Sequence, residues 1–349
     1  MFSNVIKSFG RSIAVLGIVV VIITSIIFSS PVDPTRLTFG QRMDEETVES
    51  KKKELGVDLP LGSQILLYLG DISPLSIVSR ERWEKIDYSG FSIYNSNKWH
   101  LVLKLPYLRE SFQTGRPVSN IILSALPNTI WLATSAIIIA AFLGILLGVF
   151  SFLTKDSIVD DIILSISTIG YSVPSYVSAT FFAILFGYYY SDFTGLNLQG
   201  SLWELDDFGE DTFQLKNLIL PCLALAIRPV AVITQLMRNS MYDVSKQPFV
   251  KALRAKGLST FSVTFRHMMR NALNPVVTGL SGWFASLLTG AFFVEYVFSY
   301  KGLGYTTINA LLNFDIPVVL GAILLSTTFF ILINSSIDIL YRKLDPRIK

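Results

Sequence analysis

The chain has 349 residues, of which 51% are hydrophobic and 16% are charged, and its mean hydropathy is +0.51. Such a composition is too apolar for an ordinary soluble domain and predicts an all-α protein that crosses a membrane several times. The single cysteine, Cys222, excludes a disulfide within the chain, and the two histidines, His100 and His267, argue against a histidine-rich metal site.

The first apolar run, residues 13–28, follows Lys7 and Arg11 and is typical of both a signal peptide and a first membrane helix. Signal cleavage requires small residues, and Phe28 is large, so we expect a retained helix. Five later runs can each cross about 30 Å of hydrocarbon, which predicts six transmembrane helices. The later runs are 125–153, 162–190, 215–237, 272–294 and 316–340. The prolines expected to kink them are Pro174, Pro221 and Pro229.

Basic residues are distributed unevenly between the two sides that these helices would separate. One side holds Lys7 and Arg11 before the first helix, then Lys155. The same side holds seven basic residues from Arg238 to Arg270 and four from Arg342 onward. The short loops of the other side hold only Lys216 and Lys301. Because cytoplasmic loops carry the excess of lysine and arginine, we expect both termini and loop 239–271 in the cytoplasm.

This topology divides the chain into three parts. They are the cytoplasmic N-terminus with the first helix (1–30), an extracytoplasmic domain between helices 1 and 2 (31–120), and a five-helix core (121–349). Charge order and amphipathicity predict outer-domain helices near residues 43–55 and 63–69. The aromatic-rich stretch 73–106 is expected to be irregular or short-stranded.

The most polar and basic segment among the apolar runs is residues 248–278. A short helix is expected over residues 249–256, after which Gly257 fits the left-handed position just past a helix end. Leu258 can pack back on the last turn, and Ser259 can cap a second helix. The segment therefore predicts a helix-turn-helix on one side of the membrane.

Several sequence motifs resemble those of bacterial binding-protein-dependent ABC transporter permeases, in the dipeptide, oligopeptide and nickel branch. The most specific is ALRAKGLS followed by FRHMMRNALNPVVT, which resembles the conserved cytoplasmic loop of that family. Supporting motifs are KKKELGVDLPL, SFQTGRPVSNIILSALPNTI, EYVFSYKGLG and the ending DILYRKLDPRIK. The resemblance covers nearly the whole chain and implies the six-helix type I ABC importer permease fold in a bacterial cytoplasmic (inner) membrane.

The resemblance also implies a function and a set of partners. The chain would be the permease subunit of an ATP-driven importer for di- or oligopeptides, and would form the translocation path with a second homologous permease. Two ABC ATPase subunits would bind ATP and Mg²⁺, and an extracytoplasmic binding protein would deliver the solute. We expect no cofactor, no nucleic-acid partner and no enzyme activity in this chain, which lacks a G-x-x-x-x-G-K phosphate loop.

Other functions are open alternatives. A nickel or other small-solute ABC permease shares the same motifs. An ion-coupled secondary transporter would need acids in mid-membrane or paired broken helices in an inverted repeat, and neither is evident. A membrane-embedded enzyme is disfavoured by the lack of a convincing nucleophile or metal set.

The resemblance implies that loop 246–270 contains the helix that couples transport to the ATPases. The expected coupling residues are Phe249, Lys251, Ala252, Leu253, Arg254, Ala255, Lys256, Gly257 and Leu258. Small side chains such as Ala252 permit close approach, and Phe249 and Leu253 could anchor in a partner's pocket. Lys251 and Leu253 depart from the wider family pattern, which has an acid and a small residue there. The alternatives are a basic segment lying on anionic lipid and a DNA-binding helix-turn-helix, which its tethering to the bilayer opposes.

Arg228 is the candidate for the translocation path with the clearest physical reason. It lies midway along an apolar run, where an ionisable group marks a functional site by default. The alternative is a structural tie to a carbonyl freed by Pro229. A stripe of small residues, Gly282, Ser286 and Gly290, fits either close helix packing or lining of the path.

Residues after the fifth run match the family's external motif. They are Glu295, Phe298, Gly302 and Gly304, with Lys301 where proline is common. The glycines allow a tight turn in an outer gate, and a simple loop staple is the alternative. The acidic loop 191–214 could steer the binding protein or be merely solvated. Segment 71–106, longer than its family counterpart, could be a docking surface or an idle insertion.

Overall fold

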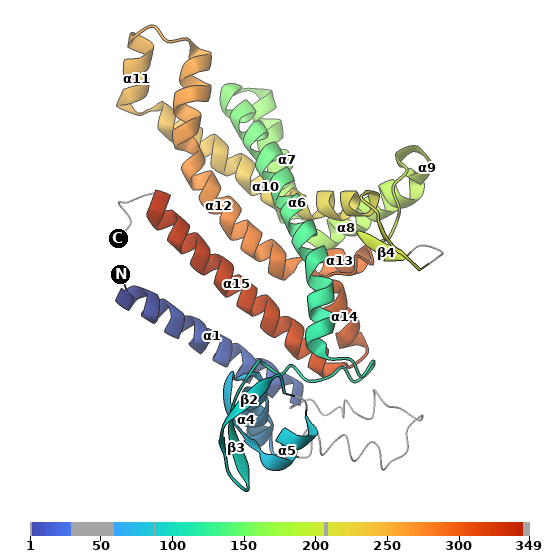
Figure 1. Ribbon diagram of the computed structural model, residues 1–349. Helices are drawn as coiled ribbons and strands as arrows, with labels where there is room; N and C mark the ends of the chain where they lie inside the picture. The colour runs from blue at the N-terminus through green and yellow to red at the C-terminus, as the bar shows by residue number, and fades with distance from the viewer. Residues whose placement is uncertain (1, 29–58, 87, 206–208, 345–349) are drawn as a thin grey trace. The chain divides into compact units, whose positions relative to one another are not determined.

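The computed structural model describes residues 2–28, 59–86, 88–205 and 209–344 and is mostly helical (Figure 1). The expected helix at 43–55 and the KKKELGVDLPL motif lie largely outside these residues. The chain forms two compact units, one made of Met1–Leu126 with Thr306–Ile331 and the other of Pro127–Tyr305 with Leu332–Lys349.

Two helices of the first unit are joined through a buried tyrosine. Helix α1 spans Phe2–Phe28 and helix α4 spans Leu61–Ile72, which confirms the helix expected near residues 63–69. Tyr68 of α4 is buried against Val20 of α1 and Leu320 of helix α15 (Ile316–Leu344). Through Tyr68, helix α4 is therefore packed against both α1 and α15.

A small antiparallel sheet follows in the same unit, with strand order β1-β3-β2. Its strands are β1 (Leu75–Ser79), β2 (Gly90–Asn95) and β3 (Trp99–Lys104), which confirms the short strands expected between residues 73 and 106. Helix α5 (Arg80–Lys85), which no sequence pattern indicated, is capped by Ser79. Val78 and Val102 form the buried face of the sheet with Trp83 and Tyr88.

Buried polar contacts fasten the segment between β3 and helix α6 (Val118–Leu153). Arg109 forms an ion pair with Asp71 at 3.0 Å, and both side chains are buried. Asp315, just before α15, accepts hydrogen bonds from the Ser111 hydroxyl at 2.5 Å and the Phe112 amide at 3.0 Å. These contacts offset part of the cost of burying the charged and polar groups of this segment.

In the second unit, the third expected span is broken rather than merely kinked. Helix α7 (Ile158–Ser172) is followed by α8 (Ser175–Ile184) and the π-helical turn η2 (Leu185–Tyr189), and the two arms are bent by 102°. Val173 is extended because proline disfavours helical geometry in the residue before it and cannot donate its own amide. Pro174 therefore ends one helix and begins the next.

Helix α10 (Lys216–Ser245) is the central helix of the second unit and packs against α7, α8 and α12. It continues through both Pro221 and Pro229. The fifth expected span is wrong at its end, because α12 (Met269–Gly290) stops four residues before Val294. Ala291 leaves helical geometry there, and the short α13 (Phe292–Val297) begins. A short helix and a hairpin, α9 (Ser191–Thr194), β4 (Trp203–Leu205) and β5 (Asp211–Phe213), precede α10.

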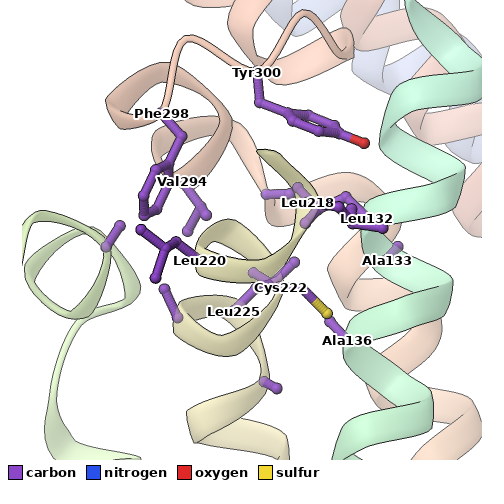
Figure 2. Packing of buried hydrophobic residues seen from close by; sticks show 14 of the residues in the cluster. Leu132, Ala133, Ala136, Leu218, Leu220, Cys222, Leu225, Val294, Phe298 and Tyr300 are labelled. Carbon is purple, nitrogen blue, oxygen red and sulfur yellow. The ribbon is translucent and has the colours of Figure 1, made fainter. Parts of the chain in front are cut away.

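Small residues allow the helices of this unit to approach closely. Figure 2 shows Leu132, Ala133 and Ala136 of α6 against Leu218, Cys222 and Leu225 of α10, with Val294, Phe298 and Tyr300 closing the cluster. Further along α6, a Cβ added at Gly148 would lie 2.6 Å from the Met237 side chain and 2.7 Å from the Thr234 carbonyl. Glycine is required there because the backbone of α6 meets α10 directly.

The multi-pass helical architecture is confirmed. Among the described residues, three helices are long and apolar enough to cross a membrane, within Val118–Leu153, Lys216–Ser245 and Ile316–Ser336. The bent pair α7–α8 makes a fourth if it counts as one span, and α1 carries a shorter apolar stretch, Ala14–Ile26. The count of six spans remains a prediction.

Candidate coupling loop and translocation path

The helix-turn-helix expected after α10 is present. Helix α11 spans Pro248–Ala255, and Gly257 follows with a φ of +79°, in the left-handed region. The Gly257 amide donates to the Arg254 carbonyl at 3.0 Å, and Leu258 packs back beside Leu253. Ser259 accepts from the Ser262 amide at 3.3 Å, so it caps the second helix as predicted. That helix begins with a π-helical segment, η3 (Ser262–Met268), which runs directly into α12.

The two hydrophobic residues expected to anchor in a partner instead face the chain's own core. Phe249 and Leu253 pack against a methionine-rich core that contains Met237, Met241 and Met268. Val250 is buried in the same core, so the apolar side of α11 is already covered. Of the nine expected coupling residues, six are exposed, namely Lys251, Ala252, Arg254, Ala255, Lys256 and Gly257.

An ion pair that the sequence analysis missed lies beneath this loop. Arg238 of α10 donates from Nε to Asp160 Oδ1 at 2.8 Å and from Nη2 to Oδ2 at 2.6 Å. The Ser151 hydroxyl of α6 also donates to Asp160, whose side chain is 2% exposed. The sequence signal for this pair was an acid, Asp160, in the first turn of α7 and an arginine, Arg238, in the last turns of α10.

A second cluster of basic residues surrounds Tyr242. The Lys155 ammonium lies 4.4 Å and the Lys246 ammonium 3.8 Å from the centroid of its ring. A hydrogen bond with Tyr242 raises the pKa of Lys155 above its usual value. The region before α11 therefore keeps its positive charge at neutral pH.

Arg228 lies between two aromatic rings beside the break in α7–α8. Its guanidinium carbon is 5.5 Å from the ring centroid of Tyr171 and 5.9 Å from that of Trp283 on α12. Its Nε donates to the Tyr171 carbonyl at 3.3 Å. That carbonyl lies at the end of α7, so the tie is to the break near Pro174 rather than to a carbonyl freed by Pro229.

Two residues of the small-residue stripe, Gly282 and Ser286, lie on an open part of α12. A Cβ added at Gly282 would meet no atom within 4 Å, and Ser286 is exposed. Gly279 is the glycine at which α12 approaches the Leu236 side chain of α10. Close packing within the chain therefore does not account for Gly282.

The external motif forms a tightly packed staple around a buried carboxylate. Glu295 accepts from the amides of Gly304 at 2.7 Å and Tyr305 at 3.1 Å, and from the Thr129 hydroxyl at 2.7 Å. Its side chain thus caps helix α14 (Leu303–Leu312). A Cβ at Gly302 would collide with the Glu295 carboxylate, and one at Gly304 with the backbone of Phe292.

The fold and the loop together define a polytopic helical membrane protein with an exposed, basic helix-turn-helix. Two family models match this chain. Residues 140–349 match the inner membrane component of binding-protein-dependent transport systems, and residues 1–85 match the N-terminal part of such membrane components.

Several relatives align over their full length. The di/tripeptide transport system permease protein DppB of Pseudomonas aeruginosa is 30% identical over 100% of this chain and 99% of its own. A putative peptide transport system permease of Brucella abortus is 32% identical over the same shares. The glutathione transport system permease protein GsiC of Shigella flexneri is 30% identical, again over 100% and 99%. A structure of the MetNI methionine ABC transporter has a TM-score of 0.49 at 15% identity, over 64% of this chain and 97% of that one.

The chain therefore belongs to the family of binding-protein-dependent transport system inner membrane components and is a permease subunit of an ABC importer. The resemblance based on its loop motifs is confirmed. Members of this family are transport subunits rather than enzymes.

Proposed function

We propose that this permease imports di- or oligopeptides and forms the translocation path with a second, homologous permease. The names of relatives that align over the whole chain support peptides as the solute class. Two ATPase subunits would bind ATP and Mg²⁺, and an extracytoplasmic binding protein would deliver the solute. The six spans would be α1, α6, the pair α7–α8, α10, α12 and α15, with both termini in the cytoplasm, as the loop charges favour.

The exposed face of α11 is the observation that supports coupling through loop 246–270. Ala252 and Ala255 leave room for another backbone, and Lys251, Arg254 and Lys256 surround them with positive charge. The opposite face of α11 packs against the methionine-rich core, which includes residues of α10 and α12. A partner that binds α11 and moves would therefore also move these two helices. ATP-driven closure of the ATPases would in this way switch the path between outward-open and inward-open forms.

The remaining candidate residues fit the two parts of such a path. Gly282 and Ser286 are exposed on α12 and Arg228 is half-buried on α10, which fits lining of the path, and Gly290 continues the same stripe in the sequence. Glu295, Phe298, Gly302 and Gly304 hold a rigid turn that suits the frame of an outer gate.

Reconstitution of the complete transporter tests the proposal. The tagged chain should co-purify with two ATPases and a second permease, and proteoliposomes should take up a dipeptide only with loaded binding protein and hydrolysable ATP. A nickel or other small-solute importer would show no dipeptide uptake under those conditions. Uptake that persists without ATP and collapses with a protonophore would instead establish an ion-coupled transporter.

A further inference from the structure

The guanidinium of Arg228 is a positive charge without a carboxylate partner among the residues that the structure describes. The other arginine of α10, Arg238, is neutralised by both oxygens of Asp160. Arg228 makes one hydrogen bond, from Nε to the Tyr171 carbonyl. Its two terminal nitrogens, which carry four of its five N–H groups, donate to no group of the described chain.

Its position prevents the charge from reaching water past the ends of the helix. Arg228 is 12 residues from Lys216 and 17 from Ser245, the ends of α10, which corresponds to about 18 Å and 26 Å along the helix axis. Only side chains near helix ends can extend to the membrane surface. Arg228 must therefore face a polar path or receive an anion within the membrane.

The surroundings hold the cation without neutralising it. The faces of the Tyr171 and Trp283 rings attract a guanidinium through their quadrupoles. Helix α7 ends at Ser172, so the partial negative charge of its last carbonyls also lies beside Arg228. These contacts fix the plane of the side chain and leave its terminal nitrogens for a ligand.

Arg228 is half-buried, and some of the groups around it are exposed. Tyr171 is 49% exposed. On α12, Ser286 is exposed and lies one turn beyond Trp283, on the same helix face, while Gly282 contributes no side chain. A solute on this exposed side of α12 would therefore lie close to the terminal nitrogens of Arg228.

We propose that Arg228, held between Tyr171 and Trp283, receives a carboxylate of the transported solute. This assignment rests on the proposed function of the chain as a peptide permease. A guanidinium matches a carboxylate through two parallel hydrogen bonds, a geometry that an ammonium cannot reproduce. The solute class is thus peptides with a free C-terminal carboxylate, and the selection acts inside the membrane, after the binding protein has released its cargo.

The experiment compares a dipeptide with its C-terminal amide in proteoliposomes that hold the complete transporter. The variants are Arg228→Gln, Arg228→Lys and, as a matched control on the same helix, Lys216→Gln at its exposed end. Binding protein is supplied at saturation for each peptide, so that the permease step limits the comparison. ATP hydrolysis and co-purification of the second permease are measured on the same samples.

Loss of two charge-assisted hydrogen bonds should lower uptake of the free acid by about 10-fold to 100-fold in Arg228→Gln. Amide uptake should stay within about twofold of wild type, Arg228→Lys should retain part of the preference, and Lys216→Gln should keep all of it. An equal loss for acid and amide overturns the assignment and leaves the permease function standing. Failure of Arg228→Gln to assemble with the second permease also overturns it, because Arg228 then pairs with that subunit. If the wild-type transporter takes up neither peptide, the proposed function falls and the assignment falls with it.

Discussion

Arg238 and Asp160 form a bidentate ion pair that joins the last turns of α10 to the first turn of α7. Ser151 adds α6 to the same carboxylate. One buried group thus fastens three helices just behind the segment that leads into α11. A buried ion pair need not be more stabilising than an apolar contact, so we infer that its role here is to hold the three helix ends in register.

Asp160→Asn should destabilise the transporter by about 3 kcal/mol, because it leaves the guanidinium of Arg238 without its counter-charge in a mostly buried site. The midpoint of thermal unfolding of the purified complex measures the effect. Asp161→Asn is the matched control, since its neighbouring carboxylate is exposed. Equal midpoints for the two variants would show that the pair contributes nothing to stability.

Gly257→Val should uncouple transport while leaving assembly intact. The position has open space around it, so the effect would come from the backbone, where a β-branched residue at a φ of +79° costs about 1–2 kcal/mol. Uptake and ATP hydrolysis are measured on the co-purified complex. Gly257→Asn is the control, because asparagine tolerates the left-handed region, and it should retain most of the uptake. Full uptake by the valine variant would remove Gly257 from the coupling mechanism.

Glu295→Ala should loosen the staple at the start of α14, since two amides and the Thr129 hydroxyl would lose their buried acceptor. Each unsatisfied donor costs about 1–3 kcal/mol, so a loss of several kcal/mol is expected. Hydrogen exchange of the amides of Gly304 and Tyr305 should rise sharply, while exchange in α11 stays unchanged. Uniform acceleration across the protein would indicate global destabilisation rather than a local staple.

Gly148→Ala should lower stability by about 1–3 kcal/mol, because the added methyl group would meet the backbone of α10 at Thr234. Gly282→Ala offers a matched control in another apolar helix, where the same methyl group meets nothing within 4 Å. Chemical unfolding in detergent compares the two. If Gly148→Ala left the free energy of unfolding unchanged, α6 and α10 could move apart without a cost in stability.

The sheet region should become more stable as the pH rises from about 8 toward 10. Burial lowers the pKa of Lys104 from 10.5 to about 8, so in this window the unfolded state is protonated and the folded state is neutral. Tyr88, whose pKa burial raises to about 12, has the opposite effect only above pH 10. Hydrogen exchange of β3, corrected for intrinsic rates, measures the trend. Lys104→Met should abolish the trend and Lys98→Met, at an exposed position, should keep it.

Local patterns predicted the helix-turn-helix correctly because its determinants are close in sequence. The left-handed Gly257, the return of Leu258 and the cap at Ser259 all depend on residues within one or two turns. For the same reason, local patterns could not show that Phe249 and Leu253 pack against the chain's own core. Whether an apolar face meets a partner or its own core is decided by Met241 and Met268, which lie on other segments.

Long-range partners account for most of what the sequence could not reveal. Arg238 and Asp160 are 78 positions apart, and Thr129 and Glu295 are 166 apart, so no periodicity connects them. Proline signalled a kink at Pro174 but not its angle, because the bend of 102° depends on how α8 packs against its neighbours. Arg228 was identified by its position alone, whereas its two aromatic neighbours come from α7 and α12.

The break at Val173 and Pro174 also limits how far α7 can carry a movement as one continuous helix. Helix α11 is connected to the first turn of α7 by the methionine-rich core and by the ion pair between Arg238 and Asp160. The first interruption of helical geometry along α7 from that ion pair is the extended Val173, two residues after Tyr171. Tyr171 lies between the ion pair and this interruption, so a movement passed from α11 to α7 would reach the ring that contacts Arg228 before it reaches α8.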